Sequence, residues 1–248
     1  MSKKWIIHGK SVPEPDYRMI LFHHAGGSAA SYLSWKKYAS ERAELCPVQL
    51  PMRENRIHEA MPDNIDILVK DFIRDEKELF SGDYVLFGHS MGGIFALETA
   101  REVKRLGLNL PLAVFISSCN PPKVSDVHDF SDLSDEKLKN ILKDYGLMQE
   151  DILNAEDYLE YYLPIARADF MLCESYNKKP DDATPLDCPL ILCYGTQDAF
   201  LKYDELDEWK SYTNSVFSKY SFDGGHFYHF ENGEKVCGII DDVCNLFS

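Results

Sequence analysis

Short apolar runs alternate with amphipathic stretches along most of the chain. Six runs have the length and composition of strands buried on both faces of a sheet, and they cover residues 19–23, 45–50, 84–88, 112–117, 190–194 and 216–222. Helical periodicity follows over residues 31–40, 65–80, 92–106, 204–212 and 234–246. The alternation predicts an α/β fold with a mostly parallel central sheet and helices on both faces.

One long stretch, residues 121–185, interrupts this alternation. It contains no convincing strand pattern, and helical patterns cover residues 134–145, 150–161 and 164–177. A long insertion between two strands is typical of a functional segment, so we expect a helical lid over the active-site edge of the sheet. Because the chain has 248 residues, we expect residues 1–248 to form a single domain that carries this lid.

Composition and charge argue against several classes of partner and site. The formal net charge of −15 disfavours nucleic acid, because phosphate contact needs a basic surface, and it disfavours an anionic membrane surface too. No apolar run approaches the roughly 20 residues of a membrane span, and an apolar signal-peptide core is missing near the N-terminus. Seven cysteines without a Cys-x-x-Cys pair predict reduced thiols. We therefore expect a cytoplasmic protein with no metal site.

The strongest local signal is the segment Gly88-His89-Ser90-Met91-Gly92. It has the pattern Gly-x-Ser-x-Gly and lies between a predicted strand and a predicted helix, which is the setting of the nucleophile elbow in the α/β-hydrolase fold. The glycines let the chain turn sharply, and the N-terminus of the helix favours developing negative charge. Ser90 is therefore the candidate nucleophile. The alternative is a glycine-rich turn whose serine only caps the helix.

A carboxylate is expected after one of the following strands, because this fold supplies its catalytic residues in the order serine, acid, histidine. Asp198 stands in the turn after the strand at 190–194 and is the preferred acid. The preceding strand is the alternative, but no acid follows its exit before Asp126.

A histidine is needed as the base, because a serine hydroxyl alone is a poor nucleophile. His226 comes after the last predicted strand, in a turn that two glycines free to fold back over the edge of the sheet. His229 is its competitor, with packing as its other role. Ser90, Asp198 and His226 are the expected catalytic triad.

Two backbone amides are expected to form an oxyanion hole. One is the amide after the nucleophile, at Met91, and the other comes from the glycine-rich loop at 22–28. His24 is the preferred residue of this loop and Ala25 the second choice. A plain turn before a helix would show the same glycines.

Together these segments resemble the type II thioesterases that accompany non-ribosomal peptide and polyketide synthases. The similarity runs from about Tyr17 to the C-terminus. The elbow and the histidine turn occur throughout α/β-hydrolases. The segments more particular to the family are a loop with Pro51, Arg53 and Arg56 and, in the lid, residues 167–170 with Tyr176. The family usually has proline where His23 stands and glycine where Met52 stands.

The resemblance implies hydrolysis of acyl groups held as thioesters on the phosphopantetheine arm of acyl or peptidyl carrier proteins. Such enzymes clear stalled or misprimed carriers, and the chemistry needs neither metal nor redox cofactor. Family carriers are commonly acidic, so Arg53 and Arg56 are candidates for steering them; internal salt bridges are the alternative role of these two arginines. Phe170, on the apolar side of the lid, is a candidate for the acyl pocket.

Three other functions remain open from the sequence. A carboxylesterase or lipase-like serine hydrolase for small molecules would use the same catalytic residues, and an acyltransferase would replace water by another acceptor. A non-enzymatic binding module is disfavoured, because all three triad residues are present in the expected order.

Overall fold

The described residues form a six-stranded sheet in which every pair of neighbouring strands is parallel. The computed structural model describes residues 5–124, 133–144, 146, 155–178 and 184–247. The strand order is β2-β1-β3-β4-β5-β6. The strands are β1 (Tyr17–Phe22), β2 (Ala43–Pro47), β3 (Tyr84–His89), β4 (Ala113–Ser117), β5 (Leu190–Gly195) and β6 (Phe217–Phe222). The predicted α/β-hydrolase class is confirmed.

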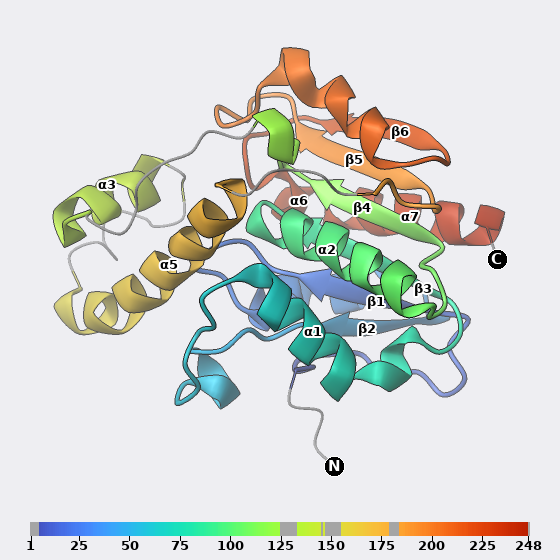
Figure 1. Ribbon diagram of the computed structural model, residues 1–248, viewed down its shortest axis with the longest axis horizontal. Helices are drawn as coiled ribbons and strands as arrows, with labels where there is room; N and C mark the ends of the chain where they lie inside the picture. The colour runs from blue at the N-terminus through green and yellow to red at the C-terminus, as the bar shows by residue number, and fades with distance from the viewer. Residues whose placement is uncertain (1–4, 125–132, 145, 147–154, 179–183, 248) are drawn as a thin grey trace.

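Alternate residues of the strands enter two separate hydrophobic cores. In β3, Leu86 packs into one core, whereas Val85 and Phe87 pack into the other, as the period of two in a strand requires. Helices α1 (Ile65–Asp75) and α2 (Met91–Leu106) cover the first face, and η1 (Ala29–Lys37) with α7 (Gly233–Phe247) covers the second (Figure 1). The central strands are therefore shielded from water on both faces, which explains their mostly apolar side chains. In the edge strand β6, by contrast, Lys219, Tyr220 and Ser221 are exposed.

Most expected helices are present, but their lengths and types differ from the sequence pattern. The helix expected over 65–80 begins after Asn64, whose side chain accepts a hydrogen bond from the Ile67 amide. It ends at Asp75 and is followed by a short 3-10 helix, η3 (Lys77–Phe80). The helical stretches expected near 31–40 and 204–212 are the 3-10 helices η1 and η5 (Tyr203–Tyr212). The remaining short helices are η2 (Glu54–Arg56), η4 (Pro122–Val124) and α6 (Tyr228–Glu231).

The predicted lid region contributes two longer helices, α3 (Asp135–Asp144) and α5 (Glu156–Asn177). The separate helices expected over 150–161 and 164–177 are one helix from Glu156 onward, which corrects that expectation; residues 150–154 lie outside the described ones. Pro164 lies inside α5 and removes one of its hydrogen bonds. Leu159 and Leu163 before the proline and Ala166 after it pack into the same core, so the buried face of the helix continues through it.

The strand order places a crevice where the active site is expected. The chain passes from β1 to β2 on one side and then returns to β3 on the other side of β1. At such a switch point the connections leave in opposite directions, and ligands bind outside the carboxyl ends of the strands. The loops after β1 and β3 are neighbours there. None of the helices in the described part of the chain is long and apolar enough to cross a membrane.

Candidate active site

Ser90 occupies a strained turn between β3 and α2. Its backbone has φ 55° and ψ −121°, a combination that is costly for a residue with a side chain. Two hydrogen bonds hold the turn: the Ser90 amide donates to the Ser117 carbonyl at 2.7 Å, and the Gly93 amide donates to the Ser90 carbonyl at 2.8 Å. This geometry matches the nucleophile elbow that the sequence predicts.

Two glycines make this turn possible because the chain packs closely on itself. A Cβ at Gly88 would clash with the carbonyl of Gly92. A Cβ at Gly92 would clash with the carbonyl of Phe22, at the end of β1. The start of α2 can therefore lie directly beside the loop after β1, which brings the Met91 amide toward that loop.

Asp198 lies in the turn after β5 and its side chain is buried. One carboxylate oxygen, Oδ2, lies 2.9 Å from Nδ1 of His226, and the other, Oδ1, accepts a hydrogen bond from the Phe200 amide at 3.0 Å. The Asp198 amide donates to the hydroxyl of Tyr203 at 2.7 Å. The carboxylate is thus held in one orientation toward the histidine.

His226 follows β6 in a turn that is tied to the turn carrying Asp198. The Gln197 amide donates to the Gly224 carbonyl at 2.9 Å, so the two turns are joined by backbone. A proton on Nδ1 of His226 is donated to Asp198, which leaves Nε2 as the basic nitrogen of the ring. Asp126, the alternative acid, lies outside the described residues.

A cavity of about 380 Å³ joins the nucleophile, the base and the lid. Ser90 and His226 both line it, and Phe170 and Glu174 of α5 contribute to its wall. Polar and apolar side chains share the lining. The structure therefore brings together Ser90, His226 and Phe170 at one cavity, as the sequence suggests, with Asp198 behind the histidine.

The two loop residues expected for the second oxyanion amide lie differently with respect to the cavity. Ala25 and Met91 line the cavity beside Ser90, whereas His24 does not. The ring of His24 instead packs edge-on against Phe227, with ring centroids 4.9 Å apart. The sequence could not distinguish neighbouring residues of one loop, because the direction of an amide depends on how the loop is folded.

Comparison with known proteins identifies the family. A family model described as Thioesterase domain matches residues 17–244. The chain belongs to the thioesterase domain family. The type II thioesterase BorB, from the borrelidin biosynthetic cluster, is 28% identical in sequence to this thioesterase, and the structures superpose with a TM-score of 0.87 over 98% of this chain and 99% of BorB.

Two further relatives of this thioesterase have similar sequence identity. ClbQ, from the colibactin pathway of non-ribosomal peptide and polyketide synthases, is 26% identical and gives a TM-score of 0.85 over 94% of this chain and 98% of ClbQ. LgrE of Brevibacillus parabrevis, named linear gramicidin dehydrogenase, is 29% identical over 98% of this chain and 94% of LgrE. The resemblance to type II thioesterases is confirmed.

Arg53 and Arg56 lie inside the protein, so of their two expected roles the structure supports internal salt bridges and not the steering of a partner. Their side chains are only 2% and 3% exposed. The Arg53 guanidinium forms a two-point ion pair with Asp169 of α5, at 2.9 and 2.7 Å. Arg56 donates to the Gln49 carbonyl at 2.8 Å and stacks over the ring of Trp5. Their charges are used within the fold and cannot steer a carrier from its surface.

A cluster of buried histidines lies behind the triad, and sequence reasoning gave it no role. The centroid of the His89 ring lies 3.9 Å from the ring centroid of His229, 5.0 Å from that of His226 and 6.0 Å from that of His24. Burial lowers the pKa of His23 to about 3 and lowers the pKa of the other buried rings well below 6.5. The other buried rings are those of His24, His89 and His229.

One polar chain ends at this histidine cluster. Nδ1 of His89 lies 2.9 Å from the hydroxyl oxygen of Ser117, which lies 2.7 Å from the hydroxyl oxygen of Tyr228. Neither ring nitrogen of His229 has a hydrogen-bond partner among the described residues. His229, the alternative base, is therefore a packed residue.

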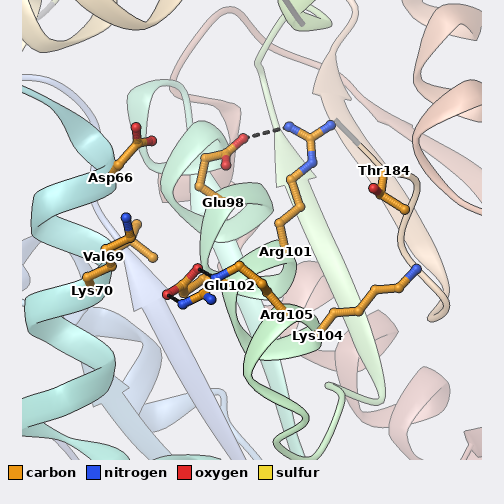
Figure 2. Close-up of a pocket in the computed structure, with 9 residues that line it drawn as sticks. All are labelled: Asp66, Val69, Lys70, Glu98, Arg101, Glu102, Lys104, Arg105 and Thr184. Carbon is orange, nitrogen blue, oxygen red and sulfur yellow. Dashed lines mark hydrogen bonds and ion pairs between the residues drawn. The ribbon is translucent and has the colours of Figure 1, made fainter. Parts of the chain in front are cut away.

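A second groove lies between α1 and α2 and has no lining residue in common with the cavity beside Ser90 (Figure 2). Its lining is charged, and its arginines pair with acids on the same helix: Arg101 with Glu98, and Arg105 with Glu102. Lys104 pairs with Asp187. Each of these three cations therefore has an acidic neighbour, which weakens its attraction for an acidic partner.

Proposed function

We propose that this protein is a type II thioesterase that hydrolyses acyl groups from the phosphopantetheine arm of carrier proteins. The observation that carries the proposal is the hydrogen bond of 2.9 Å between Asp198 and His226, with His226 and Ser90 on one cavity. The family match, and the description of BorB as a type II thioesterase and of ClbQ as part of a synthase pathway, support the substrate class.

The first half of the reaction would acylate Ser90. His226 takes the proton of the serine hydroxyl while the serine oxygen attacks the thioester carbonyl, and the Asp198 carboxylate stabilises the charged ring. The Met91 and Ala25 amides would donate to the resulting oxyanion. The carbon–sulfur bond then breaks, and the departing sulfur takes the proton from His226. The free thiol of the phosphopantetheine arm leaves.

The second half would release the acyl group. Water attacks the acyl-enzyme carbonyl while His226 removes one of its protons, and a second oxyanion forms in the same hole. When the bond between the acyl carbon and the Ser90 oxygen breaks, His226 returns the proton to the serine. The products are a carboxylic acid and the original enzyme.

The cavity supports this chemistry more directly than it supports a dehydrogenase. That word in the name of LgrE applies to LgrE; in this chain the grouped serine, histidine and aspartate suit acyl transfer rather than hydride transfer. We also retain the cytoplasm as the proposed location, because all seven cysteines are free thiols, as in proteins of reducing compartments.

Hydrolysis of a panel of acylated carrier proteins tests the proposal. The purified protein should release free acid from an acyl-carrier protein with a kcat/KM well above that for a simple ester of the same acyl group. The Ser90→Ala variant should lose about 10⁴-fold in kcat or more, since triad members act as a unit. Preference for the ester would favour a carboxylesterase, and transfer of the acyl group to another acceptor would favour an acyltransferase.

A further inference from the structure

The lid helix α5 contacts the loop that would supply one of the two oxyanion amides. This loop, here called the oxyanion loop, comprises residues 23–28 between β1 and η1. The Asp169 carboxylate of α5 accepts a hydrogen bond from the amide of Gly26 at 2.7 Å. Gly26 directly follows Ala25, so this bond holds the peptide next to the proposed oxyanion donor.

Arg53 completes the arrangement from a third part of the chain. It donates to both carboxylate oxygens of Asp169 at 2.9 and 2.7 Å, and to the carbonyl of Gly27 at 2.7 Å. Its Nε atom donates to the Pro51 carbonyl at 3.0 Å. The guanidinium therefore fixes both the carboxylate and the far side of the oxyanion loop, and its planar fork suits two-point binding of a carboxylate.

Packing limits the loop further at Gly26. This residue has φ +74°, in the region that favours glycine. A Cβ at Gly26 would clash with the hydroxyl of Tyr162, which is also part of α5. The lid helix thus contacts Gly26 with the phenol ring and hydroxyl of Tyr162 and with the Asp169 carboxylate, while its Phe170 lines the substrate cavity.

We propose that Asp169 and Arg53 are positioning residues that couple the lid to the oxyanion hole. Neither residue lines the cavity beside Ser90, so both act through the loop. With α5 in place, the Gly26 amide is bound and the Ala25 amide is held toward the cavity. With α5 displaced, the loop loses that hydrogen bond and the ion pair behind it. The hole is then complete only when the lid covers the site.

The coupling has a direct catalytic consequence. Oxyanion stabilisation depends on donors that are oriented before the charge develops, and the loss of one donor costs about 10²–10³-fold in kcat. A misplaced donor costs part of that, on the order of 10–100-fold. The loss should fall on kcat rather than KM, because the interaction forms in the transition state. This inference rests on the proposed function for the identity of the donor.

The decisive variant replaces the pair by apolar side chains of similar size, Arg53→Met with Asp169→Leu. An apolar replacement of a buried ion pair often leaves a protein as stable as before, whereas removal of one partner leaves a buried charge. Tyr176→Phe is the matched control, because Tyr176 also joins α5 to the body, through a hydrogen bond of 2.6 Å to Glu98, and this bond is made to α2 rather than to the oxyanion loop.

Two readouts are measured on folded protein, with thermal melts and circular dichroism as the check of folding. The first is kcat and KM with a small acyl-N-acetylcysteamine thioester. The second is the rate at which a fluorophosphonate labels Ser90. In this reaction the serine oxygen displaces fluoride from phosphorus, and the phosphoryl oxygen occupies the oxyanion hole. The labelling rate needs no thioesterase activity.

The double variant is expected to lose about 10–100-fold in both kcat and labelling rate, with KM changed less than about threefold. Tyr176→Phe is expected to stay within about twofold of the parent. A folded double variant with parental rates overturns the inference. If the double variant does not fold, the variant Asp169→Asn is measured instead. Its side-chain amide places an NH₂ group against the Arg53 donors, so kcat is expected to fall by about tenfold. An unchanged kcat overturns the inference.

The two proposals fail in different ways. If the parent protein is labelled at Ser90 but hydrolyses no thioester, the proposed function is wrong, and the labelling rates of the variants still test the coupling. If the parent hydrolyses thioesters and the double variant matches it, the function stands and the coupling is wrong. A parent that neither hydrolyses nor is labelled refutes both.

Discussion

The buried histidines predict that this protein loses stability steeply in mild acid. The side chains of His23, His89 and His229 are no more than 1% exposed, and that of His24 is 9% exposed. Burial lowers the pKa of all four, to about 3 for His23 and well below 6.5 for the others. In the unfolded chain each would bind a proton near its ordinary pKa of 6.5. The folded state therefore binds fewer protons below that pH.

The sign and the size follow from proton linkage. Because the folded-state pKa lies below the unfolded one, the contribution to stability is fully present above about pH 6.5 and falls as the pH decreases; for His23 the loss ends near pH 3. Well below pH 6.5, each histidine that stays uncharged in the folded protein lowers the free energy of unfolding by about 1.4 kcal/mol for every unit by which the pH decreases. From pH 7.5 to 5.5, a histidine that stays uncharged in the folded protein, as His23 does, lowers the free energy of unfolding by about 1.4 kcal/mol. The other three histidines act in the same direction.

The variant His229→Leu measures how much His229 alone contributes to this pH dependence. Neither nitrogen of His229 has a hydrogen-bond partner among the described residues, so leucine breaks no described hydrogen bond and keeps the volume close to that of the ring. Between pH 6 and 5, the free energy of unfolding of the variant should fall by up to about 1.2 kcal/mol less than that of the parent protein. His58→Gln, at an exposed position, controls for the loss of a histidine in general.

Urea titrations at several pH values measure the slope directly, through the free energy of unfolding at each pH. If His229→Leu and the parent protein show parallel pH dependences, the reasoning is refuted, because His229 would then bind its proton equally in both states. A titration of the His229 ring followed by NMR, with a midpoint near 6.5 in the folded protein, would refute it as well.

Two substitutions test the triad and a backbone position. Asp198→Asn should keep the fold and lower kcat by up to about 10⁴-fold, because the histidine loses the acceptor that orients its tautomer; steady-state kinetics check this, and a loss below tenfold would move the acid elsewhere, with Asp126 the next residue to test. Met52→Gly should raise the free energy of unfolding in urea by up to about 1 kcal/mol, because Met52 has φ 70° and glycine adopts this conformation without strain. A decrease would mean that packing of the half-buried methionine outweighs the strain.

The candidate catalytic residues could be predicted from the sequence because each one belongs to a short, recognisable segment. Ser90 stands between a strand and a helix, and Asp198 and His226 each follow a strand, so their order and setting could be recognised in short segments. In a parallel sheet the carboxyl ends of the strands meet at one edge. The preferred acid and base could therefore be placed near the serine before any tertiary contact was known, and the structure hydrogen-bonds them at 2.9 Å.

The structure supplies a physical reason for the family's preference for glycine at position 52, which the sequence alone does not give. The family pattern has glycine there, and the positive φ of Met52 explains why. The single helix α5 is a similar case. Pro164 predicts a break from local rules alone, but burial of Leu163 and Ala166 on the core keeps the helix continuous.

The burial of Arg53 and Arg56 could not be predicted from the sequence. Arg53 and Arg56 carry the same charge whether they face solvent or the interior, and the sequence pattern around them does not distinguish these cases. What decides is Asp169, which lies 116 positions from Arg53 along the chain and is brought to it by the tertiary fold. The sequence by itself determined the strand–turn–helix segments and the catalytic residue types. Only the tertiary structure decided which charges are buried together and which residues of the loop after β1 line the cavity beside Ser90, because burial and pairing depend on contacts between distant segments.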